Sequence, residues 1–186
     1  MAFPGVARIL AAALLIAAAA CGSSNTSGQG VPVASPGAIQ LTSPDFVTGG
    51  TMPTDSTCSG QDAPPQLAWT GGPPAQEFGL TLVDRDAPGG RFVHWVVWGI
   101  QGSEPGVAPG ALPAGAAEGR NDFGTNGYRG PCPPAGEPPH RYVFTIYALS
   151  QPRASALHSG ATIDDFVQAI NGYVLADGTL TGTFGG

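Results

Sequence analysis

The sequence contains no lysine, and this absence limits the partners that the protein can have. All seven basic residues are arginines, and they stand against 13 acidic residues, so the net charge is −6 at pH 7. Binding of nucleic acid or of anionic headgroups by charge needs a basic surface patch, which this composition does not provide. We therefore expect no nucleic-acid partner and no electrostatic attachment to a membrane.

Long hydrophobic runs are also missing, apart from a twelve-residue apolar stretch, Ile9–Ala20. This stretch is too short to cross a bilayer and has one basic residue before it, which fits a cleaved signal peptide over residues 1–20. Cys21 follows directly, as in a bacterial lipobox, although Ala18 stands where such motifs commonly have leucine. We predict a lipid (palmitate) anchor on Cys21, the alternative being a plain signal peptide followed by an unmodified cysteine.

The residues after Cys21 predict where the protein is held. Residues 21–38 are rich in Ser, Gly, Asn and Pro, without a hydrophobic period, as expected for a flexible tether. After removal of residues 1–20, six arginines remain against 13 acidic residues, a net charge of −7. The lipid rather than charge would then hold the protein on the extracytoplasmic face of the cell membrane.

Cysteine is scarce in the rest of the chain, where only Cys58 and Cys132 occur. In an exported protein, two remaining cysteines are a candidate disulfide. Two buried free thiols are the competing interpretation, and the sequence leaves both open.

Glycine and proline are abundant, with 29 and 19 residues, but 42% of the chain is hydrophobic. We expect one mainly β domain over residues 39–186, an antiparallel sandwich or barrel with a large sheet and one or two peripheral helices. The predicted helix is Thr162–Asn171, with Thr162 as N-cap, an apolar stripe of Ile163, Phe166, Val167 and Ile170, and Gly172 at its end. Strands are predicted at Ile39–Phe46, Gln66–Thr70, Leu80–Val83, Phe92–Ile100, Arg141–Leu149 and Thr179–Phe184.

Ionisable residues stand where three of these strands meet loops. Alternation places Asp84 and Asp86 on the face of Leu80 and Leu82. It groups Phe92, His94, Val96, Trp98 and Ile100 on the next strand, and His140, Tyr142, Phe144, Ile146 and Ala148 on a third. Because buried carboxylates and imidazoles are costly unless paired or solvated, such clusters predict the mouth of a pocket.

Each of these residues also has an ordinary structural interpretation. Loop aspartates such as Asp84 and Asp86 commonly cap turns, and a histidine such as His94 within an apolar strand is usually a satisfied core residue.

The spacing of these residues matches no standard zinc-ligand pattern, and the sequence contains no G-x-S-x-G motif. We therefore expect no metal and no cofactor. His158 is predicted to lie on the surface. The loop Gly130–Gly136 is stiffened by prolines, and its amides could face an anion.

Several separated segments carry distinctive residues: Asp84-Arg85-Asp86-Ala87-Pro88, His94-Trp95, Gly130-Pro131-Cys132-Pro133-Pro134 and His140-Arg141-Tyr142, with Cys58-Ser59-Gly60 through Trp69 before them. Together they resemble the signature blocks of the phosphatidylethanolamine-binding protein family, whose bacterial members are often called Raf-kinase-inhibitor-like. The resemblance covers about residues 39–184, and two departures are Gly99, where the family commonly has asparagine, and Arg85, where it commonly has proline. We expect the side chain of Arg85 to point away from the aspartates.

The resemblance implies an antiparallel β fold with a pocket that takes a phosphate headgroup. It implies that the pocket is lined by Asp84, Asp86, Pro88, His94, Gly130, Cys132, His140 and Tyr142. We further hypothesise that Asp84 or Asp86 orients or charges His94. The predicted function is non-catalytic binding of a small anionic or phosphorylated ligand, with a possible role in regulating a partner protein. The alternatives are an inhibitor of a secreted protease or modulator of a kinase, acting through the loops of residues 101–139, and a hydrolase that uses the Asp and His cluster.

Overall fold

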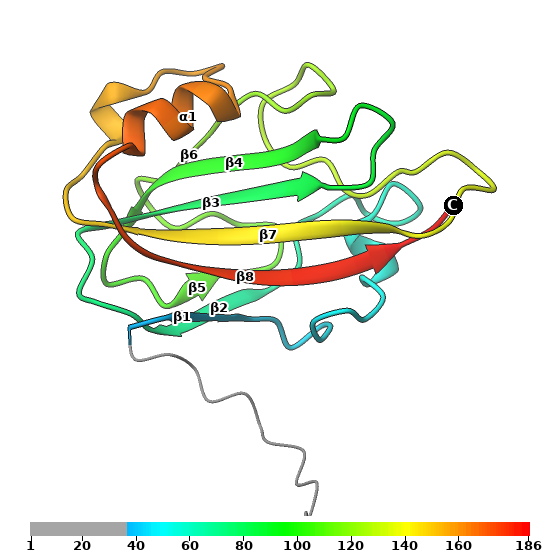
Figure 1. The fold of residues 1–186 in the computed structure, drawn as a ribbon, viewed down its shortest axis with the longest axis horizontal. Helices are drawn as coiled ribbons and strands as arrows, with labels where there is room; N and C mark the ends of the chain where they lie inside the picture. Colours follow the sequence, from blue (N-terminus) through cyan, green and yellow to red (C-terminus); the bar gives the residue numbers. More distant parts are fainter. Residues whose placement is uncertain (1–36) are drawn as a thin grey trace, which may run out of the picture. The chain divides into compact units, whose positions relative to one another are not determined.

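The computed structural model describes residues 37–186, which form two antiparallel sheets with few helices (Figure 1). This confirms the predicted mainly β class. The larger sheet has the strand order β6-β4-β3-β7-β8, and the smaller has the order β1-β2-β5. The strands are β1 (Ile39–Thr42), β2 (Leu67–Gly71), β3 (Glu77–Asp84), β4 (Phe92–Gln101), β5 (Gly106–Val107), β6 (Ala117–Glu118), β7 (His140–Leu149) and β8 (Val174–Phe184). The helices are α1 (Ile163–Ile170) and two short 3-10 turns, Thr54–Ser56 and Ala154–Ala156.

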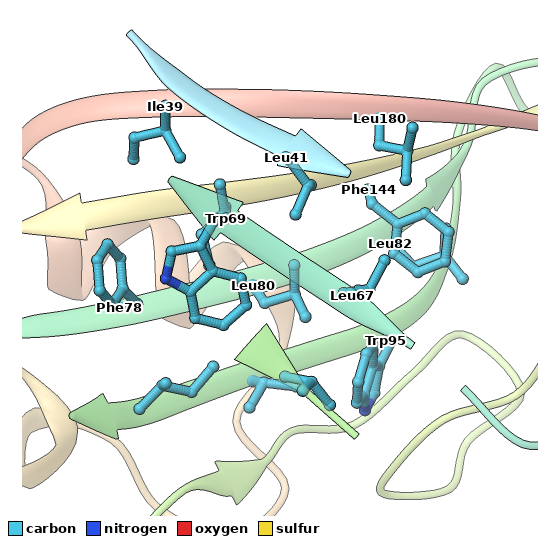
Figure 2. Packing of buried hydrophobic residues seen from close by; sticks show 14 of the residues in the cluster. Ile39, Leu41, Leu67, Trp69, Phe78, Leu80, Leu82, Trp95, Phe144 and Leu180 are labelled. Carbon is cyan, nitrogen blue, oxygen red and sulfur yellow. The ribbon is translucent and has the colours of Figure 1, made fainter. Parts of the chain in front are cut away.

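The main core lies between the two sheets (Figure 2). Ile39 and Leu41 of β1 and Trp69 of β2 face Leu80 and Leu82 of β3 across this layer. From β7 the even-numbered residues enter the same core, as alternation predicted: Tyr142, Phe144, Ile146 and Ala148. Strand β3 has apolar residues buried on both faces because the smaller sheet covers one face and α1 covers the other.

The helix α1 packs on the opposite face of the large sheet (Figure 1). It begins as predicted, with a capping box in which Thr162 and Asp165 bond each other's backbone amides. Phe166 enters the second core, where Gly79 of β3 leaves room for its ring, since a Cβ there would lie 2.4 Å from Phe166 Cζ. The predicted stripe is too wide by one residue, because Val167 is 50% exposed. Gly172 follows the C-cap with φ of +82°, as predicted.

Strand β4 does not alternate regularly, because its register with β3 shifts at two places. Near the first shift, His94 and Trp95 are consecutive but both lie on the side of the main core, where the His94 ring packs edge-on against Tyr142. A β-bulge has this effect, since an extra residue breaks the two-residue period. Near the second shift, Gly99 has φ of +74°, a conformation that glycine and asparagine adopt most readily.

The predicted common face of β4 is therefore wrong in part. Val96 and Trp98 pack in the helix-side core, whereas Ile100 lies in the main core. Other boundaries differ too: β1 stops at Thr42, just before Pro44, and β8 begins at Val174, five residues earlier than predicted. No helix within residues 37–186 is long and apolar enough to span a membrane. The predicted signal peptide, Cys21 and tether residues 21–36 lie outside the described residues.

Candidate functional site

A cavity of about 260 Å³ opens where three strands of the large sheet meet their loops. Because β3 runs antiparallel to both neighbours, the end of β3 lies beside the start of β4 and of β7: Asp84 pairs with Phe92 on one side and with Tyr142 on the other. Residues far apart in the sequence thus converge at one end of the sheet. The lining residues are Asp84, Ala87, Pro88, Phe92, His94, Phe123, Cys132, Pro133, Pro134, His140 and Tyr142.

His140 is held between two carboxylates. Its Nδ1 lies 2.8 Å from Asp84 Oδ2, and its Nε2 lies 3.0 Å from Glu137 Oε2. Since both carboxylates accept, both ring nitrogens donate, and the imidazole is then positively charged. The hydrogen bond to Asp84, followed by the charges of Asp84 and Glu137, raises the pKa of His140. His140 is thus the positive group in the cavity wall.

His94 has the opposite character. Its Nδ1 donates to the backbone oxygen of Arg129 at 2.7 Å, and its ring is packed edge-on by Phe92, Phe123 and Tyr142. Burial lowers the pKa of His94, so the ring is neutral at neutral pH. The hypothesis that Asp84 or Asp86 orients His94 is wrong. Asp84 bonds His140 instead, and Asp86 bonds Arg141.

Tyr142 carries a buried hydroxyl that lies beside Asp84 but forms no hydrogen bond of good geometry within residues 37–186. The residue is fully buried and lines the cavity. Burial, followed by the charge of Asp84 and a contact of the hydroxyl with the Asp84 carboxylate, raises the pKa of Tyr142, so the hydroxyl keeps its proton. An unpaired buried hydroxyl is costly and rare in native proteins, and this one belongs to a residue of the cavity lining.

Two of the predicted site residues do not line the cavity. Asp86 forms a two-pronged ion pair with Arg141, at 2.9 Å from Nε and 2.7 Å from Nη2, and it accepts from the Arg141 amide. These bonds lower the pKa of Asp86 to about 2. Asp86 therefore joins the β3–β4 loop to the start of β7. Arg85 is exposed between the two aspartates.

Gly130 is the second predicted residue outside the cavity lining. Its amide donates to Asp62 Oδ1 at 2.6 Å, so it is not free to bind an anion. A Cβ on Gly130 would lie 2.3 Å from the Ser56 carbonyl oxygen, so glycine is needed for the close approach of two loops. Cys58 and Cys132 are bonded in a disulfide at the same junction, with Cα atoms 5.4 Å apart.

Sequence reasoning placed six of its eight pocket residues in the lining and missed several others. Asp84, Pro88, His94, Cys132, His140 and Tyr142 line the cavity. Phe123, which lines the cavity, and Glu137, which bonds His140 from outside the lining, were not singled out, because each lies in a loop where no periodicity indicates direction. Within residues 37–186 no three Asp, Glu, His or Cys side chains are grouped to hold a metal ion. His158 is exposed, as predicted.

Comparison with known proteins agrees with this architecture. The sequence model described as phosphatidylethanolamine-binding protein matches residues 42–185. The chain belongs to the phosphatidylethanolamine-binding protein family. The resemblance predicted from the sequence is thereby confirmed.

Relatives in this family include proteins from bacteria and archaea. A Mycobacterium tuberculosis protein named "Putative lipoprotein LppC" is 41% identical over 155 residues, which is 83% of this chain and 75% of LppC. A UPF0098 protein of Methanothermobacter thermautotrophicus is 40% identical over 141 residues, 73% of this chain and 91% of the relative. The crystal structure of Escherichia coli YbcL, described as a new member of the mammalian PEBP family, is also similar. It has a TM-score of 0.74 and 32% identity, over 79% of this chain and 98% of YbcL.

Proposed function

We propose that the protein binds a small anionic or phosphorylated ligand, such as a phospholipid headgroup, in the cavity at the end of the large sheet, without catalysis. One observation carries this proposal: Tyr142 lines the cavity, and its buried hydroxyl forms no hydrogen bond of good geometry among the described residues. The positive imidazole of His140 lines the same cavity. The positive charge of His140 and the hydroxyl of Tyr142 both favour an acidic oxygen as ligand, although Asp84 and Glu137 occupy the two ring nitrogens of His140 in the structure.

The composition of the lining supports binding rather than hydrolysis. No serine or threonine lines the cavity, and the sulfur of Cys132 is bonded to Cys58. Both oxygens of Asp84 are engaged, one by His140 and the other by the Asp86 amide at 2.8 Å. A carboxylate held in this way is poorly placed to attack a substrate.

We propose a lipid anchor at Cys21 on the extracytoplasmic face of the membrane, as the lipobox-like sequence and the name of the relative LppC suggest. Intact-mass measurement of the protein from cells tests this, since acylation adds the mass of the lipid to a chain that begins at Cys21. A mature mass without that addition would contradict the anchor. Regulation of a protease or kinase stays a prediction.

Calorimetric titration of the purified full-length chain with phosphoethanolamine, a small phosphate ester, tests the pocket. We expect saturable binding that His140→Gln weakens, because the variant removes the positive charge in the wall. His158→Gln is the matched control, since His158 is exposed and does not line the cavity. Equal affinity in the two variants, or no binding by the wild type, would overturn the assignment.

A further inference from the structure

The two carboxylates that hold His140 differ in how freely they can move. Asp84 is the last residue of the buried strand β3, and its side chain is 6% exposed. Glu137 lies in the loop before β7, and its side chain is 39% exposed. A carboxylate near water can leave its partner and be solvated, whereas a buried one leaves only at a large cost in desolvation. Glu137 is therefore the partner of His140 that can be exchanged.

The loop that carries Glu137 also forms part of the cavity wall. Pro133 and Pro134 line the cavity, and the Glu137 amide donates to the Pro134 oxygen at 3.2 Å. Gly136, between them, has φ of +85°, and a Cβ added there would meet nothing within 4 Å. The contacts of this turn include one long backbone bond, the bond of Glu137 to His140 and the packing of Gly186 against Pro133 and Pro134. A change at Glu137 would be transmitted to the wall.

Both ring nitrogens of His140 are occupied by the protein's own carboxylates. An acidic ligand can therefore obtain a hydrogen bond from His140 only if one carboxylate withdraws. With Glu137 in place, the two carboxylates outweigh the single positive imidazole and oppose an anion. With Glu137 in solvent, an oxyanion in its place accepts a charged hydrogen bond from Nε2 of His140, whose ring lines the same cavity as Tyr142.

We propose that Glu137 is a displaceable internal counter-ion: its carboxylate occupies Nε2 of His140 in the empty pocket and gives way to the oxyanion of the ligand. This inference rests on the proposed function and adds a specificity determinant to it. Neutral molecules cannot replace the charge of Glu137 and are excluded, whereas phosphate or carboxylate groups can replace it. Binding also loosens the wall at Pro134, because the loop loses its contact with His140.

The test compares wild type, Glu137→Gln and Glu104→Gln in the full-length chain, titrated at pH 6 with inorganic phosphate and, separately, with acetate. Glutamine keeps the shape of Glu137 but competes for Nε2 without a charge, and Asp84 still holds His140 protonated. We expect Glu137→Gln to bind at least one of the anions about tenfold more tightly than wild type, since a charged hydrogen bond no longer competes. Glu104 neither lines the cavity nor bonds a residue that does, whereas Glu137 bonds His140, so Glu104→Gln should bind as wild type does.

The outcomes separate this inference from the proposed function. Tighter binding in Glu137→Gln alone supports the counter-ion, and the anion that is tightened identifies the ligand as a phosphate or a carboxylate. Unchanged or weaker binding in Glu137→Gln, with wild type binding normally, overturns the counter-ion and leaves the pocket intact. Absence of binding in all three proteins overturns both.

Discussion

Replacing Tyr142 by phenylalanine separates the stability of the fold from the function of the cavity. The change deletes one oxygen and keeps the ring, which packs edge-on against His94 at 5.3 Å and stacks on His140 at 6.3 Å. In the empty protein the buried hydroxyl has no partner, and such a group costs roughly 1–3 kcal/mol. We therefore expect Tyr142→Phe to be about 1 kcal/mol more stable than wild type, or about 3 °C higher in Tm.

The same variant should bind the ligand less well. A hydrogen bond to a charged group contributes about 1.5 kcal/mol or more, so we expect the affinity for phosphoethanolamine to fall about tenfold. Urea denaturation and calorimetry on one preparation of the full-length chain measure both quantities. Opposite changes in stability and affinity are typical of a group that is kept for function.

Tyr128→Phe is the matched control. The hydroxyl of Tyr128 donates to the Ser56 oxygen at 2.6 Å, and Tyr128 does not line the cavity. Its loss should lower stability by about 1 kcal/mol and leave the affinity unchanged. If Tyr142→Phe instead behaves like this control, less stable and with unchanged affinity, the hydroxyl has a partner in the protein and the reasoning is refuted.

Three further predictions concern residues around the cavity. Asp86→Asn should remove about 1 kcal/mol of stability at neutral pH without changing ligand affinity, because the pair with Arg141 is partly exposed to solvent. Since the pKa of Asp86 is lowered to about 2, this contribution should be complete above pH 4 and vanish as the pH falls towards 2, which urea unfolding of both proteins at several pH values would detect. Gly130→Ala should lose about 3 kcal/mol or fail to fold, because the new methyl group overlaps a backbone carbonyl of the neighbouring loop; normal stability in thermal unfolding would contradict this. Replacing Cys58 and Cys132 by serine should cost about 4 kcal/mol, because the bond closes a loop with a sequence separation of 74, and an unchanged Tm would argue against the disulfide.

The sequence predicts the elements that depend on a regular period. β7 was predicted with its inward face because every second residue from Tyr142 to Ala148 is apolar, and the start of α1 because Thr162 is a good N-cap before an apolar stripe. These signals are contained in a few consecutive residues. The face of β4 was predicted wrongly because its two register shifts leave no mark in the hydrophobic pattern.

The candidate site could be predicted only in part for a related reason. The residues at strand ends, such as Asp84 and His140, were found because antiparallel neighbours bring strand ends together. Asp86 looked like a pocket residue by alternation, but its partner Arg141 could not be known before the pairing of the strands. Glu137 was missed because its contact with His140 depends on the conformation of a proline-rich loop.

A crystal structure of the full-length chain grown with phosphoethanolamine tests the central claim most directly. The account predicts the phosphate group in the cavity at the end of β3, within hydrogen-bonding distance of the Tyr142 hydroxyl and of Nε2 of His140, with Glu137 turned to solvent. If the cavity holds no phosphoethanolamine in crystals grown at a saturating concentration of it, and the Tyr142 hydroxyl still has no partner, the account is contradicted.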